Sequence, residues 1–205
     1  MKTFFTSDPH FYHANIIKFC NRPYSNTHEM NEALIANWNR KVSKADQVYL
    51  LGDVSFGSPG ATEGILGRLN GKIHLIKGNH DKSGMLSKIG GRFTSINDYL
   101  EITVQSPVIQ NKKHNQKIVL FHYPIESWNG KHKGYYHLHG HSHGNVKSPG
   151  ILREDAGVDS WNYEPFSFEK LYEHFSKKDL NKPQPDSYSS ERKEAAEAIE
   201  HFVIQ

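Results

Sequence analysis

Short apolar runs alternate with segments of helical periodicity along the first half of the chain. The predicted strands are Lys2–Thr6, Gln47–Leu51 and Lys72–Lys77. The predicted helices are Ala14–Cys20, Thr27 to about Lys44 with Thr27 as the N-cap, and Ala61–Leu69. Strands that alternate with helices favour a core of parallel strands.

The second half of the chain is richer in strands. Strands are predicted within Phe93–Val104, over Lys117–Phe121, at about Gly134–His139 and, as a last short strand, at Ala156–Asp159. The polar segment Asn111–Gln116 predicts a turn, and Ser167–Lys177 predicts an amphipathic helix capped by Ser167. The whole pattern predicts either one mixed sheet or two packed sheets flanked by helices.

The C-terminal residues differ in composition from the rest. Asn181–Ser190 is rich in Pro, Ser and Asp and predicts a linker. Glu191–Phe202 predicts a helix with few apolar anchors, which either docks on the domain or mediates self-association. We therefore expect one folded domain over residues 1–180, followed by a linker and a C-terminal helix over residues 181–205. The sequence does not indicate the oligomeric state.

Composition narrows the class of protein. A chain of 205 residues can bury a substantial core, and a formal net charge of +3 is too small to indicate a nucleic-acid binder by itself. Cys20 is the single cysteine, so neither an internal disulfide nor a thiolate metal cluster is expected. Because no run of about 18 apolar residues occurs, no membrane span is expected either. We expect a cytoplasmic protein with no membrane partner.

Polar side chains follow the predicted strands, at the point where each strand ends. They are Asp8 and His10 after the first strand, Asp53 after the second, Asn79, His80 and Asp81 after the third, then His122, and finally His141 and His143. Because ligands of α/β sheets gather beyond the carboxyl ends of the strands, these five loops are expected to converge. Oxygen and imidazole donors without thiolate suit Mn, Fe, Zn, Ni or Mg. Two such ions about 3.5–4 Å apart can polarise a phosphoryl group, and Asp53 is a candidate bridge between them.

Each motif alone also has an ordinary structural interpretation. Asp8-x-His10 and Gly52-Asp53 are common in turns, and a lone His122 before Tyr-Pro is more often a structural histidine. Gly140-His141-Ser142-His143 could be a solvated loop. All five motifs in order, each at a strand end, favour the metal site.

With these motifs in place, the chain resembles the calcineurin-like metallophosphoesterase superfamily from Lys2 to Phe175. The resembling elements are Asp-x-His, Gly-Asp, Gly-Asn-His-Asp, His and Gly-His-x-His. The opening Asp-x-His-Phe-x-His-x-Asn-Ile-Ile and the Gly157–Tyr163 segment are similar to small bacterial and phage members. The resemblance implies an α/β (α+β) fold, a four-layer β-sandwich of two mixed sheets flanked by helices.

The resemblance also implies the roles of individual residues. One metal ion would be bound by Asp8, His10 and His143, and the second by Asn79, His122 and His141, with Asp53 bridging both. His80 would protonate the leaving oxygen or stabilise the transition state, and Asp81 would orient and charge-stabilise its imidazole. A metal-bridging hydroxide would attack phosphorus in line. Two divalent ions are expected, with Mn favoured over Fe, Zn, Ni or Mg.

The substrate class is less strongly indicated. The protein-phosphatase branch of that family usually carries Glu after Gly-Asn-His and an arginine pair; here Asp81 follows and no matching pair is found. This favours a phosphodiesterase acting on a nucleotide, a cyclic nucleotide or an RNA end. The alternatives are a phosphomonoesterase on a small phosphate ester and a non-catalytic scaffold. Candidate substrate-binding residues are His13, Arg22 and Lys133.

Overall fold

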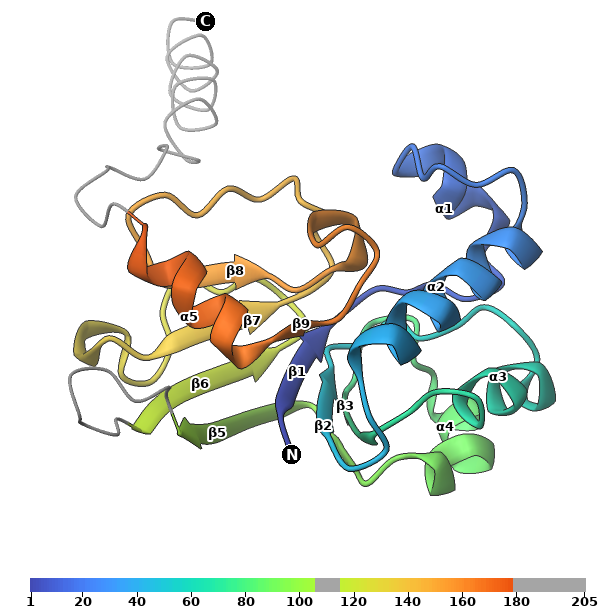
Figure 1. Ribbon diagram of the computed structural model, residues 1–205, viewed down its shortest axis with the longest axis horizontal. Coiled ribbons are helices and arrows are strands. Elements are labelled where there is room, and N and C mark those ends of the chain that lie inside the picture. The colour runs from blue at the N-terminus through green and yellow to red at the C-terminus, as the bar shows by residue number, and fades with distance from the viewer. Residues whose placement is uncertain (106–114, 179–205) are drawn as a thin grey trace, which may run out of the picture.

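A computed structural model of the protein describes residues 1–105 and 115–178, and these residues form two β-sheets (Figure 1). The first sheet has the order β4-β3-β2-β1-β9. Its strands are β1 (Thr3–Thr6), β2 (Gln47–Leu50), β3 (Lys72–Ile76), β4 (Ser95–Asn97) and β9 (Phe166–Ser167). Strands β1 to β4 are parallel to one another, whereas β9 is antiparallel to β1.

The second sheet has the order β5-β6-β7-β8. Its strands are β5 (Tyr99–Gln105), β6 (Asn115–Phe121), β7 (Tyr136–His139) and β8 (Arg153–Asp155). Strand β5 is antiparallel to β6, and β6, β7 and β8 run parallel. Both sheets are therefore mixed, as the resemblance implied, and the predicted fold class is confirmed.

Helices cover the sheets, and two apolar cores result. The α-helices are α1 (Ala14–Phe19), α2 (Thr27–Lys41), α3 (Pro59–Leu66), α4 (Ser83–Ile89) and α5 (Phe168–Ser176), and the 3-10 helices are η1 (Gly90–Arg92), η2 (Lys131–Lys133) and η3 (Val158–Ser160). Figure 1 shows α2, α3 and α4 on one side of β1–β3 and the second sheet on the other. Residues such as Trp38 of α2 and Leu75 of β3 form the first core. The second core joins Phe5, Leu120 and Leu171, from both sheets and α5.

Capping side chains decide several helix boundaries. The predicted N-cap Thr27 is wrong, because Asn26 caps α2 by accepting a hydrogen bond from the Glu29 N–H at 2.9 Å. Helix α3 begins earlier than predicted, since Ser58 caps it and Pro59 occupies its first turn. Ser167 caps α5, as predicted. Helix α4 was not predicted from the sequence; it is only 7 residues long.

The structure corrects one further prediction, and several others fall on residues that it does not describe. The predicted strand at Ala156–Asp159 is wrong: β8 ends at Asp155, and the chain turns into η3 after the Asp155 carboxylate accepts the Gly157 N–H at 2.7 Å. Of the predicted Asn111–Gln116 turn, the last two residues belong to β6 and the rest lies outside the described residues. The boundary at residue 180, the linker and the C-terminal helix also lie outside them. No helix within residues 1–105 and 115–178 is long and apolar enough to cross a membrane.

Candidate metal centre

Loops from the carboxyl ends of five strands meet at one place between the two sheets. Backbone hydrogen bonds join them: the Asp8 N–H donates to the Gly52 carbonyl at 3.1 Å, and the Gly140 N–H donates to the His122 carbonyl at 2.9 Å. The first bond joins the loops after β1 and β2, and the second joins the loops after β6 and β7. The convergence expected from the strand ends is therefore present.

The glycines of the motifs allow the loops to approach one another. A Cβ added to Gly78 would lie 2.6 Å from the Asp53 nitrogen and 2.9 Å from His122 Cε1. A Cβ on Gly140 would lie 2.9 Å from Ser7 Cβ. Because heavy atoms cannot approach this closely, each position requires glycine. The Gly in Gly-Asn-His and in Gly-His-x-His thus serves loop packing.

Most of the predicted metal ligands have a left-handed backbone. The positive φ values are 55° at Asp8, 50° at His10, 54° at Asp53, 68° at His141 and 47° at His143. This conformation costs a non-glycine residue about 1–2 kcal/mol. Such strain concentrates at functional sites, where the surrounding structure holds the residue in place. The same turns aim these side chains at one another.

The first donor group consists of Asp8, His10 and His143. One ligand atom from each lies within 4.8 Å of the others. Asp8 and His10 are buried, yet Asp8 Oδ1 and both ring nitrogens of His10 have no hydrogen-bond partner among the described residues. Buried polar atoms are normally satisfied, so these atoms indicate a bound group.

The second donor group consists of Asp53, His122 and His141, whose ligand atoms also lie within 4.8 Å of one another. Asn79 belongs beside them, because its Oδ1 lies 3.0 Å from His122 Nε2. His122 is fully buried, whereas Asn79 and His141 are exposed. The centre therefore opens to solvent on the side of this second group.

Asp53 lies between the two groups. Its Oδ2 is 3.6 Å from His10 Nε2 in the first group, and its Oδ1 is 3.7 Å from His122 Nε2 in the second. One carboxylate thus presents an oxygen to each group. This is the arrangement required of a ligand that bridges two cations.

The pKa shifts of the buried side chains Asp8 and His10 are consistent with a site for a cation. Burial raises the pKa of Asp8 to about 8 and lowers the pKa of His10 to about 2. Burial without a counter-charge thus favours the neutral form of both side chains. A divalent ion would supply positive charge to the carboxylate, and neutral imidazole is the form that binds metals. The donor set fits Mn, Fe, Zn, Ni or Mg.

Two histidines have their tautomers set by partners outside the centre. His122 Nδ1 donates to the Leu51 carbonyl at 2.6 Å, and His143 Nδ1 donates to Asp159 Oδ2 at 2.8 Å. Each ring then presents the lone pair of Nε2 toward the donor groups. Burial by itself would lower the pKa of His143, but the hydrogen bond to Asp159 and the charge of Asp8 outweigh burial and raise that pKa. Partners of this kind orient metal ligands.

Asp159 contacts the centre without having been predicted from the sequence. It accepts from His143 and also from Arg22, whose Nε and Nη2 each lie 2.8 Å from one of its oxygens. The signal available was a carboxylate in the Gly157–Tyr163 segment. Its partners are 16 and 137 residues away in the sequence, so spacing could not reveal them.

His80 and Asp81 follow Asn79 and have different environments. The His80 ring is 42% exposed, with Nε2 3.9 Å from Asp53 Oδ2, and its backbone N–H donates to Asp53 Oδ1 at 2.9 Å. Asp81 makes no hydrogen bond or ion pair with this imidazole, so the geometry does not support the expected orienting role. Its carboxylate accepts the backbone N–H groups of Asp53, Val54 and Gly78 at 2.8–3.0 Å. Asp81 instead holds the loops after β2 and β3 together.

The three candidate substrate-binding residues have different outcomes. His13 lies beside the centre, with its ring centroid 5.3 Å from that of His10. Arg22 cannot bind substrate as predicted, because its side chain is 0% exposed and donates to Asp159 and to the Pro9 and Asp8 carbonyls. The prediction for Lys133 is also wrong. Lys133 precedes β7, whereas the centre lies beyond the carboxyl end of that strand.

Comparison with known proteins identifies the family. The model of the calcineurin-like phosphoesterases matches residues 1–197. The chain belongs to the calcineurin-like phosphoesterase family. This membership, together with the two donor groups, supports a metal-dependent phosphoesterase.

Its relatives in this family include archaeal and phage proteins. An uncharacterized protein of Methanocaldococcus jannaschii is 36% identical over 178 residues, which cover 83% of this chain and 89% of that protein. A gene 66 protein of a mycobacteriophage is 27% identical over 179 residues, covering 77% of this chain and 88% of that protein. A crystal structure of a protein of unknown function from Aquifex aeolicus matches with a TM-score of 0.63 at 23% identity. It covers 84% of this chain and 98% of that chain, a likeness that shows the fold.

Proposed function

We propose that this calcineurin-like phosphoesterase is a dinuclear-metal phosphodiesterase that acts on a nucleotide, a cyclic nucleotide or an RNA end. The observation that carries the proposal is the position of Asp53 between two donor groups, with one oxygen toward each. Asp8, His10 and His143 would hold one divalent ion, and Asn79, His122 and His141 the other. Manganese is the favoured ion.

The chain's own residues position the reaction around those ions. Two divalent ions supply Lewis acidity toward a phosphoryl group and an activated water near neutral pH. The His80 ring is 42% exposed, and its Nε2 lies 3.9 Å from Asp53 Oδ2. There it can donate a proton to the leaving oxygen. The strained loops and the buried partners of His122 and His143 keep the ligand side chains in place before substrate binds.

Two observations favour a diester over a monoester. Each arginine within residues 1–105 and 115–178 already pairs with a carboxylate, so none is free to grip a phosphomonoester dianion. In addition, two small hollows of about 180 and 220 Å³ flank the Gly78–Asp81 loop. A diester has one group to place in each hollow.

The test compares two chromogenic esters, bis-p-nitrophenyl phosphate and p-nitrophenyl phosphate, with Mn²⁺ and with EDTA. We expect Mn²⁺-dependent hydrolysis, faster for the diester and abolished by EDTA. His80→Ala should lower the rate about 10²-fold or more, the usual contribution of a general acid. The matched control is His132→Ala, an exposed histidine of η2 at the other end of β7.

Each result has a defined meaning. Faster hydrolysis of the monoester would favour the alternative, a phosphomonoesterase on a small phosphate ester. Two bound ions by calorimetry without hydrolysis of either ester would favour a scaffold. Absence of metal binding would overturn the proposal.

A further inference from the structure

Phe56 is a large apolar side chain that is exposed at the edge of the metal centre. It is 42% exposed, although its ring centroid lies 4.7 Å from that of His80 and 5.5 Å from that of His10. Ligand sites are lined mainly by apolar and aromatic side chains, so an exposed ring beside the centre is a candidate ligand contact. The ring closest to the expected proton donor is therefore available to a ligand.

The position of Phe56 is set by its neighbours. His13 stacks against it, with centroids 3.9 Å apart and 13° between the ring planes. The Phe56 N–H donates to the Phe11 carbonyl at 2.9 Å, which joins its loop to the loop after β1. His13 therefore packs on one face of the Phe56 ring and holds the ring in place. A supported aromatic ring loses little freedom when it stacks on a ligand.

The hollow in front of Phe56 has the size and chemistry for one ring. Its volume is about 180 Å³, and its lining includes His80, Lys82 and Met85. This is below the range of about 300–1,000 Å³ typical of whole drug-sized ligands, so it fits only part of a substrate. Lys82 is exposed and has no ion-pair partner among the described residues, which leaves its ammonium available to a polar edge or phosphate.

A second exposed aromatic residue lies at the opposite end of the centre. Tyr123 is 38% exposed, and its ring lies 4.8 Å from that of His141 and 5.1 Å from that of His122. It lines the hollow of about 220 Å³. Because His80 lies on the side of Phe56, the group that leaves the phosphorus is expected on that side, and the retained group on the side of Tyr123.

We propose that Phe56, supported by His13 and aided by Lys82, is the stacking platform for a nucleobase on the leaving group of a phosphodiester. The proposal rests on the proposed phosphodiesterase function and specifies its substrate as a nucleotide joined through phosphate to a second nucleoside. In the hydrolysis, a water oxygen bonds to phosphorus while the P–O bond to the leaving nucleoside breaks. His80 Nε2 gives its proton to the leaving oxygen and is reprotonated by the proton that the water releases.

The experiment uses three dinucleotides with Mn²⁺ and the full chain. The first dinucleotide carries both bases. The second lacks the base of one nucleoside, and the third lacks the base of the other. The reaction products identify which nucleoside leaves. We expect kcat/KM to fall about tenfold or more when the leaving residue is abasic, the usual effect of losing base stacking. In Phe56→Leu, the ratio of kcat/KM for the intact substrate to kcat/KM for the substrate that lacks the leaving-side base should fall toward one. Phe56→Trp should keep the ratio, and so should the matched variant Tyr123→Leu.

The outcomes separate this proposal from the proposed function. A ratio that is unchanged in Phe56→Leu, or equal to one in the wild type, overturns the platform. Hydrolysis of bis-p-nitrophenyl phosphate without hydrolysis of any dinucleotide also overturns it, while the phosphodiesterase function stands. Hydrolysis of none of these diesters overturns both.

Discussion

At the scale of single residues, the metal centre depends on atoms that do not themselves bind metal. Asp159 sets the tautomer of His143 and neutralises Arg22. Asp81 joins two loops through three backbone N–H groups. Gly78 allows Asp53 to reach both donor groups. The consequence is that substitutions outside the ligand set should change metal binding.

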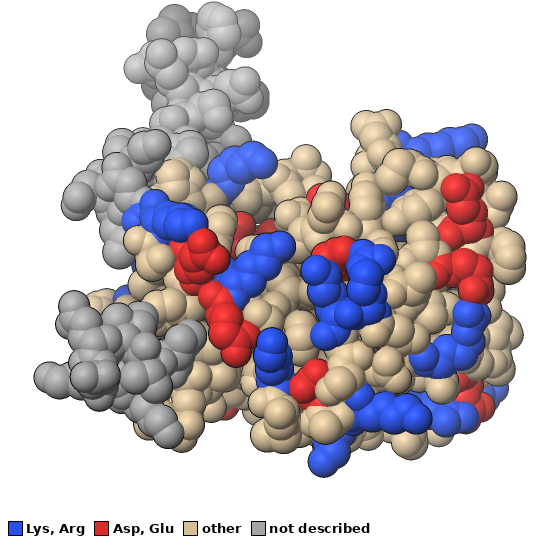
Figure 2. All heavy atoms as spheres, viewed as in Figure 1, with Lys and Arg blue, Asp and Glu red and all other residues tan. Residues whose placement is uncertain are grey.

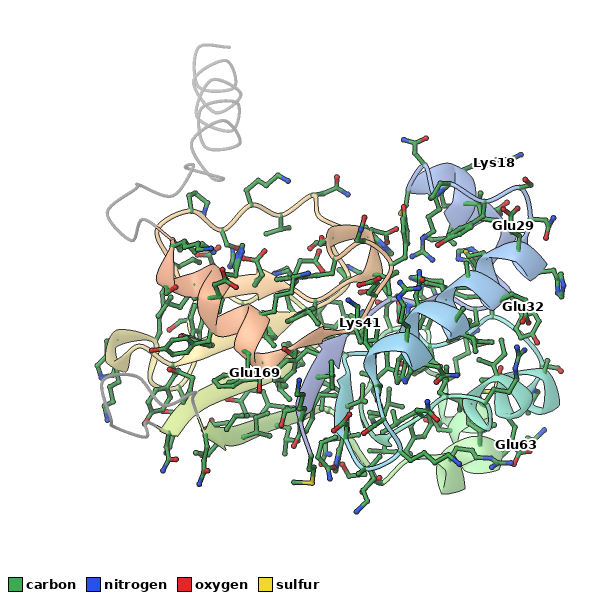
Figure 3. All side chains as sticks on the ribbon, in the orientation of Figure 1. Lys18, Glu29, Glu32, Lys41, Glu63 and Glu169 are labelled. Carbon is green, nitrogen blue, oxygen red and sulfur yellow. The ribbon has the colours of Figure 1, made fainter. Side chains whose placement is uncertain are left out.

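Asp159→Asn should weaken metal binding about 10–100-fold, the usual effect of changing a residue that orients a ligand. An asparagine can still accept from Arg22, so the fold should persist, but the amide supplies no negative charge to His143. Calorimetric titration with Mn²⁺ measures the change. The control is Glu32→Gln, which breaks an exposed pair with Arg68 on the outer side of α2 (Figure 3). Equal affinities in the two variants would contradict the assigned role.

Gly78→Ala should disrupt the centre, because the new methyl group would lie 2.6 Å from the Asp53 nitrogen. We expect loss of Mn²⁺ binding and destabilisation of about 2 kcal/mol or more, as in overpacked sites. The matched control is Gly84→Ala in α4, where an added Cβ meets no atom within 4 Å. That variant should be neutral or stabilised by up to about 1 kcal/mol. Urea denaturation compares both; similar midpoints would refute the packing argument.

At the scale of elements, the parallel strands bring the ligand loops together, and side-chain pairs hold the outer helices. On β8, Glu154 accepts from His174 of α5 at 2.8 Å and from Lys178 at 3.3 Å. Burial opposes ionisation, but His174 and Lys178 together lower the pKa of Glu154. A carboxyl group with a lowered pKa stabilises the fold above its unfolded pKa, and this contribution is lost as the pH falls through the folded value.

Glu154→Gln should therefore lower the free energy of unfolding at pH 7 by about 1 kcal/mol, the upper range for a partly exposed pair. The difference from the wild type should shrink as the pH falls below the ordinary glutamate pKa. Glu173→Gln, which removes a 64% exposed carboxyl on α5, should have a much smaller effect. Urea titrations from pH 7 to pH 3 measure both. A difference that stays constant with pH would exclude the ionic contribution.

At the scale of the whole molecule, the centre joins the two sheets. The first sheet supplies the loops with Asp8, Asp53 and Asn79, and the second supplies those with His122 and His141. On the face shown in Figure 2, basic and acidic side chains are interspersed, in keeping with a formal net charge of +3. Binding energy is thus expected from the centre and its hollows more than from a long-range field.

Metal removal should destabilise the folded chain, because the ligands meet only when both sheets are packed. At a free Mn²⁺ concentration of 100 times Kd, the stabilisation should be about 2.7 kcal/mol for each occupied site. Thermal unfolding with Mn²⁺ and after EDTA treatment measures this difference. Asp53→Asn should lose most of it, whereas Glu32→Gln should retain it. A metal effect of equal size in Asp53→Asn would show that the ions bind elsewhere.

The amino-acid sequence by itself determined the family and most of the strands and helices, although not α4 or the end of β8. Apolar runs marked the buried strands, and the polar residues after them marked the five loops, because strand ends and ligand positions are local in the sequence. Parallel strands then bring such loops to one edge, so Asp8, Asp53 and His122 could be grouped without a structure.

The tertiary structure alone decided the roles that depend on burial and distant partners. Arg22 follows the first motif as a binding residue would, but packing buries it against Asp159, far away in the sequence. Lys133 lies between two ligand loops in the sequence but at the opposite end of β7 in space. Phe56 has no local pattern that distinguishes it from a core residue; only its exposure beside His80 does so. Sequence patterns report short-range periodicity, whereas these contacts arise from how the two sheets pack.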